Sequence, residues 1–258
     1  MQTVSSSHPD DSWRREFPRL AELRDNAPST EPGTFFHSIP ATVAANLLAH
    51  EVYQELESDL AVLDGDAWSA FKSKLLQCDL KRHGHRGYTG IHSVLYEAKG
   101  YRLLKQELSR MNLDHDQIVL IPETDQCKTP EWAAFWRGTP VGVLEVKTIY
   151  ESDDQSKYVY ENTRKILECG EATVRRGDPS IPGAFWRKLQ STVDRARDQL
   201  DYYAPEKNIP RIAFLIVHFD HDLTMEPANY AAAASFLDGL RNDKFQVAYQ
   251  FRGLNAPT

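Results

Sequence analysis

Between residues 93 and 218 the spacing of apolar residues changes from helical to strand-like and back, and this order strongly limits the possible folds. Residues 94–111 and 184–203 carry apolar side chains at helical spacing. Four short apolar and β-branched runs are typical of strands, namely 117–121, 132–136, 141–149 and 212–217. A helix, three strands, a helix and a strand therefore follow one another, which predicts an α/β fold with a mixed central sheet flanked by helices.

The rest of the chain surrounds this segment. Residues 1–35 are rich in Ser and Pro and predict a flexible or loosely packed arm, whereas residues 36–92 hold two helical patterns and predict an N-terminal helical cover. We assign residues 93–258 to one core, with a polar helical insertion at 150–183. A further helix is expected near 227–241 and a last strand near 245–251.

Composition excludes several classes of protein. No apolar run approaches the roughly 18 residues that a membrane span needs, and the first residues lack the blocks of a signal peptide. Three cysteines at long spacings suggest reduced thiols, so we expect an intracellular, cytoplasmic protein without membrane contact. A net charge of −7 excludes a generic polycation, so any contact with nucleic acid must be local.

The third expected strand carries the residues that suggest chemistry. Because side chains alternate along a strand, Glu145 and Lys147 share one face, opposite to the apolar residues between them. A hairpin closing at Arg137 and Gly138 would bring Glu131 level with Glu145. Two neighbouring carboxylates suit Mg²⁺, and Lys147 would orient or deprotonate an attacking water or steady the charge on a phosphate.

Pro130-Glu131, followed by Glu145-Val146-Lys147 in a strand hairpin, resembles the PD-(D/E)XK nuclease superfamily. The resemblance covers roughly residues 93–218. It implies the restriction-endonuclease-like fold, with an α-β-β-β-α-β core, and cleavage of DNA more often than RNA with Mg²⁺ or Mn²⁺. It also implies that Glu131 and Glu145 are metal ligands and that Lys147 is the catalytic lysine.

Two further positions follow from the resemblance alone. Glu97 on the first core helix matches an additional metal ligand. Gln190 on the second core helix matches a polar position near some sites of the family, where it would contact nucleic acid. The chain departs from the family pattern at Glu131, where the pattern has Asp. Glu123 and Asp125 are the alternative carboxylates if the strand alignment slips.

The Glu-x-Lys triplet alone is weak, because Glu97-Ala98-Lys99 is a second one, on a helix where the two charged side chains do not share a face. The structural alternative for Glu145 and Lys147 is an ion pair on a solvent-facing sheet surface.

Local basic residues suggest where a nucleic acid would bind. Arg86 lies in a glycine-rich loop before the first core helix, where unpaired N–H groups favour an anion. Arg175, Arg176 and Lys188 belong to a basic surplus between residues 164 and 188, for which a solvated helix face is the alternative.

Two histidine groups were weighed as metal sites. One group consists of His83, His85 and His92 with Cys78, whose side chains are of the types that bind zinc. No Cys-x-x-Cys pair accompanies them, so we interpret this segment as a surface loop. Residues 218–222 contain two His and two Asp, which commonly cap a turn after a strand.

We therefore expect a Mg²⁺-dependent nuclease that acts on DNA in restriction, defence or repair. A homodimer would supply the two sites that cutting two strands needs. One alternative is an inactive interaction module that keeps the nuclease fold. Another is a nuclease effector activated by a ligand that binds the N-terminal helices or residues 150–183.

Overall fold

The structure is a computed structural model. It describes residues 9–27, 35–45, 47–79, 89–122, 129–150, 183–205, 209–219, 227–242 and 245–252 of the chain. The chain divides into two compact units, of which unit 1 comprises Met1–Arg82 and Tyr88–Arg102 and unit 2 comprises His83–Gly87 and Leu103–Thr258. The division therefore falls inside a helix, ten residues beyond the predicted boundary at residues 92 and 93. Within the described ranges, no helix combines the length and apolarity of a membrane span.

Unit 1 is helical. Its elements are α1 (Pro9–Glu16), α2 (Pro18–Asn26), α3 (Phe35–Ala45), α4 (Leu47–Ala61), α5 (Gly65–Asp79) and the first part of α6 (Thr89–Arg110). Asp64 joins two of them, because its carboxylate accepts hydrogen bonds from the Ala67 N–H at the start of α5 (3.0 Å) and from the Tyr101 hydroxyl of α6 (2.8 Å). Burial and this carboxylate raise the pKa of Tyr101 to about 12.

The prediction of a loosely packed arm is wrong for residues 9–27, which form α1 and α2. Phe17, Leu20 and Leu23 are fully buried there. Proline favours the first position of a helix, where its missing N–H costs nothing, so Pro18 marks the start of α2 rather than a loop. The Glu57 carboxylate accepts hydrogen bonds from the N–H groups of Arg19 (2.8 Å) and Leu20 (3.0 Å) and so caps α2. Residues 1–8 and 28–34 lie outside the described part of the chain.

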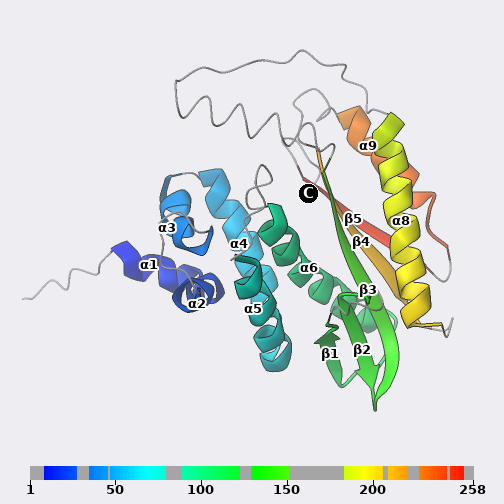
Figure 1. The fold of residues 1–258 in the computed structure, drawn as a ribbon, viewed down its shortest axis with the longest axis horizontal. Coiled ribbons are helices and arrows are strands. Elements are labelled where there is room, and N and C mark those ends of the chain that lie inside the picture. Colours follow the sequence, from blue (N-terminus) through cyan, green and yellow to red (C-terminus); the bar gives the residue numbers. More distant parts are fainter. Residues whose placement is uncertain are drawn as a thin grey trace, which may run out of the picture. The chain divides into compact units, whose positions relative to one another are not determined.

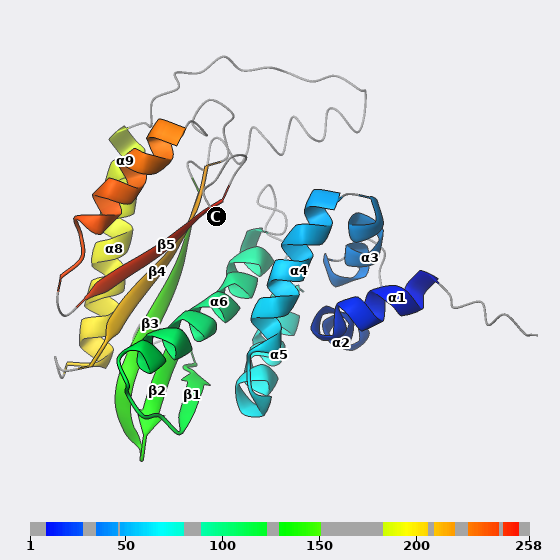
Figure 2. The same cartoon turned by 180° about the vertical axis from the view of Figure 1, so that it is seen from behind.

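Unit 2 is built on a five-stranded sheet (Figures 1 and 2). Its strands are β1 (Gln117–Leu120), β2 (Trp132–Trp136), β3 (Thr139–Tyr150), β4 (Arg211–His218) and β5 (Gln246–Arg252), in this spatial order. The pairs β1–β2 and β2–β3 are antiparallel, whereas β3–β4 and β4–β5 are parallel. The predicted α/β class with a mixed sheet is confirmed, and the order of helix, three strands, helix and strand is present.

A two-residue hairpin turn and a β-bulge together set the register between β2 and β3. Trp136 pairs with Thr139, and the two residues between them, Arg137 (φ 49°) and Gly138 (φ 79°), both adopt left-handed backbone conformations. Such two-residue turns match the twist of a hairpin and favour glycine. The predicted turn is therefore confirmed. Between Phe135 and Ala134 a β-bulge shifts the register by one residue, and after it Trp132 pairs with Leu144.

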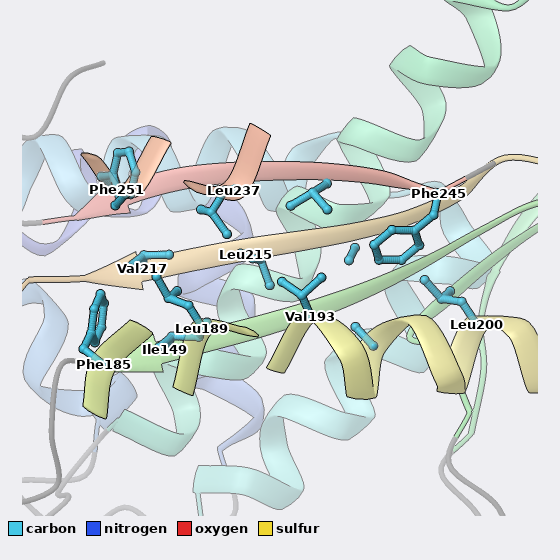
Figure 3. Packing of buried hydrophobic residues seen from close by; sticks show 14 of the residues in the cluster. Ile149, Phe185, Leu189, Val193, Leu200, Leu215, Val217, Leu237, Phe245 and Phe251 are labelled. Carbon is cyan, nitrogen blue, oxygen red and sulfur yellow. The ribbon is translucent and has the colours of Figure 1, made fainter. Parts of the chain in front are cut away.

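Helices lie on both faces of this sheet (Figures 1 and 2). Helix α8 (Gly183–Tyr203) and helix α9 (Pro227–Asp238) cover one face, and residues 103–110 of α6 lie on the other. Figure 3 shows Leu189 and Val193 of α8 beside Leu215 and Val217 of β4, while Leu200 lies further along the helix, toward Phe245, in the same cluster. Each fully buried side chain of this size contributes about 1.5–3 kcal/mol, so this layer is the main core of unit 2. The predicted insertion lies almost wholly within 151–182, which the structure does not describe.

Gly142 tests the packing on the α6 face. A Cβ atom there would lie 3.1 Å from Leu108 Cδ2 and 3.3 Å from Leu104 Cδ1. We expect Gly142→Leu to lower the free energy of unfolding by about 1–3 kcal/mol, because a larger side chain overpacks this contact. Urea denaturation measures the effect. The control is Gly183→Leu at the exposed start of α8, where the nearest atom is the end of Arg187 at 3.7 Å. Equal stability of the two variants would contradict the close packing of α6 on β3.

Candidate functional site

Glu145 and Lys147 lie on the face of β3 that α8 covers. Their neighbours on that face, Val143 and Ile149, belong to the core formed with α8. The Glu145 side chain is 0% exposed, whereas the Lys147 side chain is 31% exposed. The alternative of a solvent-facing ion pair is therefore wrong for the carboxylate, which is buried, although the ammonium reaches solvent.

The buried carboxylate is bound on both oxygens. Lys147 Nζ donates a hydrogen bond to Glu145 Oε1, and Gln199 Nε2 of α8 donates one to Glu145 Oε2 at 3.0 Å. The same Gln199 nitrogen also contacts the Thr129 carbonyl oxygen. A buried charge is tolerated only when it is paired and hydrogen-bonded, and these contacts meet that requirement. Gln199 therefore ties α8 to the segment before β2 and to β3.

Glu131 lies level with Glu145. It directly precedes β2, and the pairing of Trp132 with Leu144 makes Glu145 the next position opposite Glu131. Glu131 Oε2 accepts a hydrogen bond from the Val146 N–H at 2.7 Å. The side chain thus supplies an acceptor to β3 where the backbone pairing of β2 has ended. The expected proximity of the two carboxylates rests on this register.

Helix geometry separates the two glutamines of α8. Gln190 donates to the Asp194 carboxylate at 3.0 and 3.1 Å, whereas Gln199 reaches Glu145. Each helical residue turns by about 100°, so nine residues place these two side chains about half a turn apart. Gln190 therefore stays outside the cluster that contains Gln199. The sequence offers one signal for Gln199, a polar residue directly beside the apolar stripe of Ala196 and Leu200.

Glu97 lies in unit 1, where its carboxylate binds Lys74 Nζ at 2.9 and 2.7 Å. Lys99, the other end of the helical Glu-x-Lys triplet, pairs instead with Glu55 and Asp59. The helix directs the two side chains to different partners, as expected from their spacing. The role of Glu97 as a metal ligand therefore stays a prediction.

Of the residues predicted to bind nucleic acid, Lys188 and Gln190 are described, and their binding to nucleic acid stays a prediction. Lys188 Nζ donates a hydrogen bond to the carbonyl oxygen of Tyr150 at the end of β3 (2.7 Å). Arg86, Arg175 and Arg176 lie outside the described residues, as do the alternative carboxylates Glu123 and Asp125.

The histidines weighed as metal ligands have aromatic neighbours. His92 packs edge-on against Phe35 with ring centroids 5.0 Å apart, and His218 stacks on Tyr150 at 4.6 Å. Among the residues that the structure describes, no three His, Cys, Asp or Glu side chains are grouped so as to hold one metal ion. His83, His85 and residues 220–222 belong to the ranges left undescribed.

Comparison with protein-family models, with curated proteins and with solved structures gave no match to this chain. The chemistry of the site is therefore inferred from its own residues.

The pairing of Glu145 with Lys147 is testable by a double-mutant cycle. We expect Lys147→Met to lower the free energy of unfolding by about 1–3 kcal/mol, because it leaves a fully buried carboxylate without its cation. Glu145→Gln in the same chain is expected to recover part of this loss. Urea denaturation of the wild type, both single variants and the double variant gives the coupling energy.

Lys105→Met removes an exposed lysine from α6 and serves as the control. Two results would contradict a coupled buried pair. One is a loss of unfolding free energy for Lys147→Met that is no larger than for this control. The other is strict additivity of the two single variants in the cycle.

Proposed function

We propose that this protein is a metal-dependent nuclease of the PD-(D/E)XK type that hydrolyses phosphodiester bonds in DNA, in restriction, defence or repair. The observation that carries the proposal is the arrangement of Glu131, Glu145 and Lys147. Glu131, directly before β2, is level with Glu145 on β3, and the lysine ammonium contacts the buried Glu145 carboxylate.

The fold supports the same proposal. In the core that the resemblance implies, a helix precedes three strands, and a second helix leads to a fourth. Here α6 precedes the antiparallel β1, β2 and β3, and α8 precedes β4, which runs parallel to β3. Glu145 and Lys147 lie on β3, and Glu131 directly precedes β2.

The donor set fits a hard divalent cation. Glu131 and Glu145 offer carboxylate oxygens, the ligands that Mg²⁺ and Mn²⁺ prefer, and Mg²⁺ is often held by only two protein carboxylates with water and substrate phosphate. Each carboxylate oxygen has two lone pairs, so one hydrogen bond does not exhaust it. These two residues would hold the ion, which when bound would polarise the phosphate and lower the pKa of a water molecule.

The chain's own residues would position the reacting groups. Hydrolysis joins a water oxygen to phosphorus, breaks the bond from phosphorus to the leaving oxygen and transfers one proton of the water to that oxygen. Lys147 Nζ lies beside Glu145 and is partly exposed, so it would orient the water or stabilise the negative charge on the phosphate. Gln199 would hold Glu145 in place through its second oxygen.

Nuclease activity is tested with plasmid, linear and single-stranded DNA and with RNA, each in Mg²⁺, Mn²⁺ or EDTA. We expect DNA to be cut only with the divalent ion. Glu145→Gln, Glu131→Gln and Lys147→Met should each lower the rate at least about 100-fold, because each removes a group that acts in the transition state.

Asp198→Ala and Lys105→Ala, which change exposed charges of unit 2, serve as controls and should keep the activity. Circular dichroism checks that every variant is folded. Metal-independent cutting, or cutting that survives in all three site variants, would contradict this assignment.

A second candidate is an interaction module that keeps the fold without catalysis. The full engagement of both Glu145 oxygens by Lys147 and Gln199 favours it, because a self-contained network stabilises the fold without a metal. The two candidates differ in ion binding. A nuclease should gain thermal stability with Mn²⁺, whereas a module should not, and Glu145→Gln should abolish the gain. Homodimer formation stays a prediction that follows from cutting duplex DNA.

A further inference from the structure

Helix α8 has two polar edges beside its buried stripe, and they face different parts of unit 2. One edge, here called the α9-side edge, contains Trp186, Gln190, Asp194 and Arg197. Trp186 packs on Phe236 of α9 with centroids 5.3 Å apart, and Arg197 lies 4.7 Å over the ring of Phe245. This edge is therefore part of the packing between α8, α9 and β5.

The other edge, here called the β3-side edge, consists of Lys188, Thr192, Arg195 and Gln199, spaced so that they share one side of the helix. It is fixed to β3 at both ends. Gln199 Nε2 contacts Glu145 Oε2 at 3.0 Å, and Lys188 Nζ contacts the Tyr150 carbonyl at 2.7 Å. Helix α8 thus runs alongside β3 in the opposite direction.

The lengths of the two elements agree with this arrangement. Eleven residues separate Lys188 from Gln199, which is about 16 Å of helix, and five residues separate Glu145 from Tyr150, which is about 16 Å of strand. Arg195 lies about 6 Å along α8 from Gln199, and Lys147 lies about 7 Å along β3 from Glu145, in the same direction. Arg195 and Lys147 are therefore level with each other.

The Arg195 side chain is held in place yet reaches solvent. Its Nε donates to the Ser191 carbonyl at 3.1 Å, and its Nη2 donates to Thr192 Oγ1 at 3.3 Å. These contacts use two of the five N–H donors of a guanidinium. The residue is exposed, whereas Thr192 and Gln199 on the same edge are buried. Among the cationic side chains of this edge, Arg195 is thus the exposed one that lies at the same height along β3 as Lys147.

We propose that the β3-side edge of α8 binds the phosphate backbone of one DNA strand as it passes Glu131 and Glu145, with Arg195 contacting a phosphate directly. The proposal rests on the proposed nuclease function and names how its substrate is held. Arg195 and Lys188 place two cations along this edge, and Lys147 of β3 is level with Arg195. A guanidinium also presents a fork of donors that matches phosphate oxygens. The edge is about 16 Å long, which corresponds to roughly five nucleotides of one strand.

Equilibrium binding tests this proposal separately from catalysis. The probes are a fluorescein-labelled 20-nucleotide single-stranded DNA, its duplex and an RNA of the same sequence, in EDTA so that no metal-dependent cutting occurs. Fluorescence anisotropy gives the dissociation constant between 50 and 200 mM NaCl. We expect Arg195→Ala to weaken single-stranded DNA binding about three- to tenfold and to reduce the salt slope by about 0.7, the value for one lost phosphate contact. Arg195→Lys should recover most of the affinity.

The matched control is Arg110→Ala at the end of α6, which removes the same charge from an exposed position of unit 2. It should leave the affinity and the salt slope unchanged. Thermal denaturation checks that both variants keep the wild-type stability.

The outcomes separate this proposal from the nuclease assignment. Weaker binding by Arg195→Ala alone supports the β3-side edge even if no condition gives DNA cleavage. Equal binding by the Arg195→Ala and Arg110→Ala variants overturns it even if the wild type cuts DNA. Failure of the wild type to bind either DNA probe, or sensitivity to Arg195 confined to RNA, also overturns it.

Discussion

The packing of α8 on β3 and β4 decides which side chains meet in unit 2. Leu189, Val193 and Leu200 form its buried stripe, and this stripe fixes the rotation of the helix about its axis. Once that rotation is set, Gln199 points to Glu145 and Gln190 points to the opposite side. The apolar contacts therefore determine the polar ones, because no other rotation buries the same stripe.

Burial of Glu145 then defines the character of the site. A carboxylate without solvent contact requires compensation, which Lys147 and Gln199 supply from a strand and a helix. The same contacts orient the carboxylate, so a group that is costly to bury becomes rigid. Rigid, water-poor charged groups are also what a phosphoryl-transfer site needs, because their interactions strengthen as solvent is excluded. The arrangement therefore suits both a purely structural role and a catalytic one. Binding of a divalent ion distinguishes the two roles.

The sequence predicts the parts of this structure that depend on local patterns. The strands and the turn at Arg137 and Gly138 are predictable because runs of apolar and β-branched residues and turn chemistry act over a few residues. Helices α1 and α2 do not follow from the sequence, because the Ser and Pro content of residues 1–35 favours a loosely packed arm and the Glu57 carboxylate that caps α2 comes from α4, far along the chain. Gln199 was missed because only the packed rotation of α8 shows which polar residue faces β3.

Glu131 shows how one side chain combines two requirements. Pairing with β3 ends at Trp132, yet the Val146 N–H still receives an acceptor, the Glu131 carboxylate oxygen at 2.7 Å. An aspartate in its place would be shorter by one methylene, or about 1.5 Å, so the same backbone would not bring its oxygen to that N–H. The longer side chain therefore continues the hydrogen bonding to β3 by one residue beyond the end of β2, and it keeps a carboxylate level with Glu145. On this argument glutamate rather than aspartate at position 131 is a local adjustment to where β2 ends, and it is compatible with the proposed metal site.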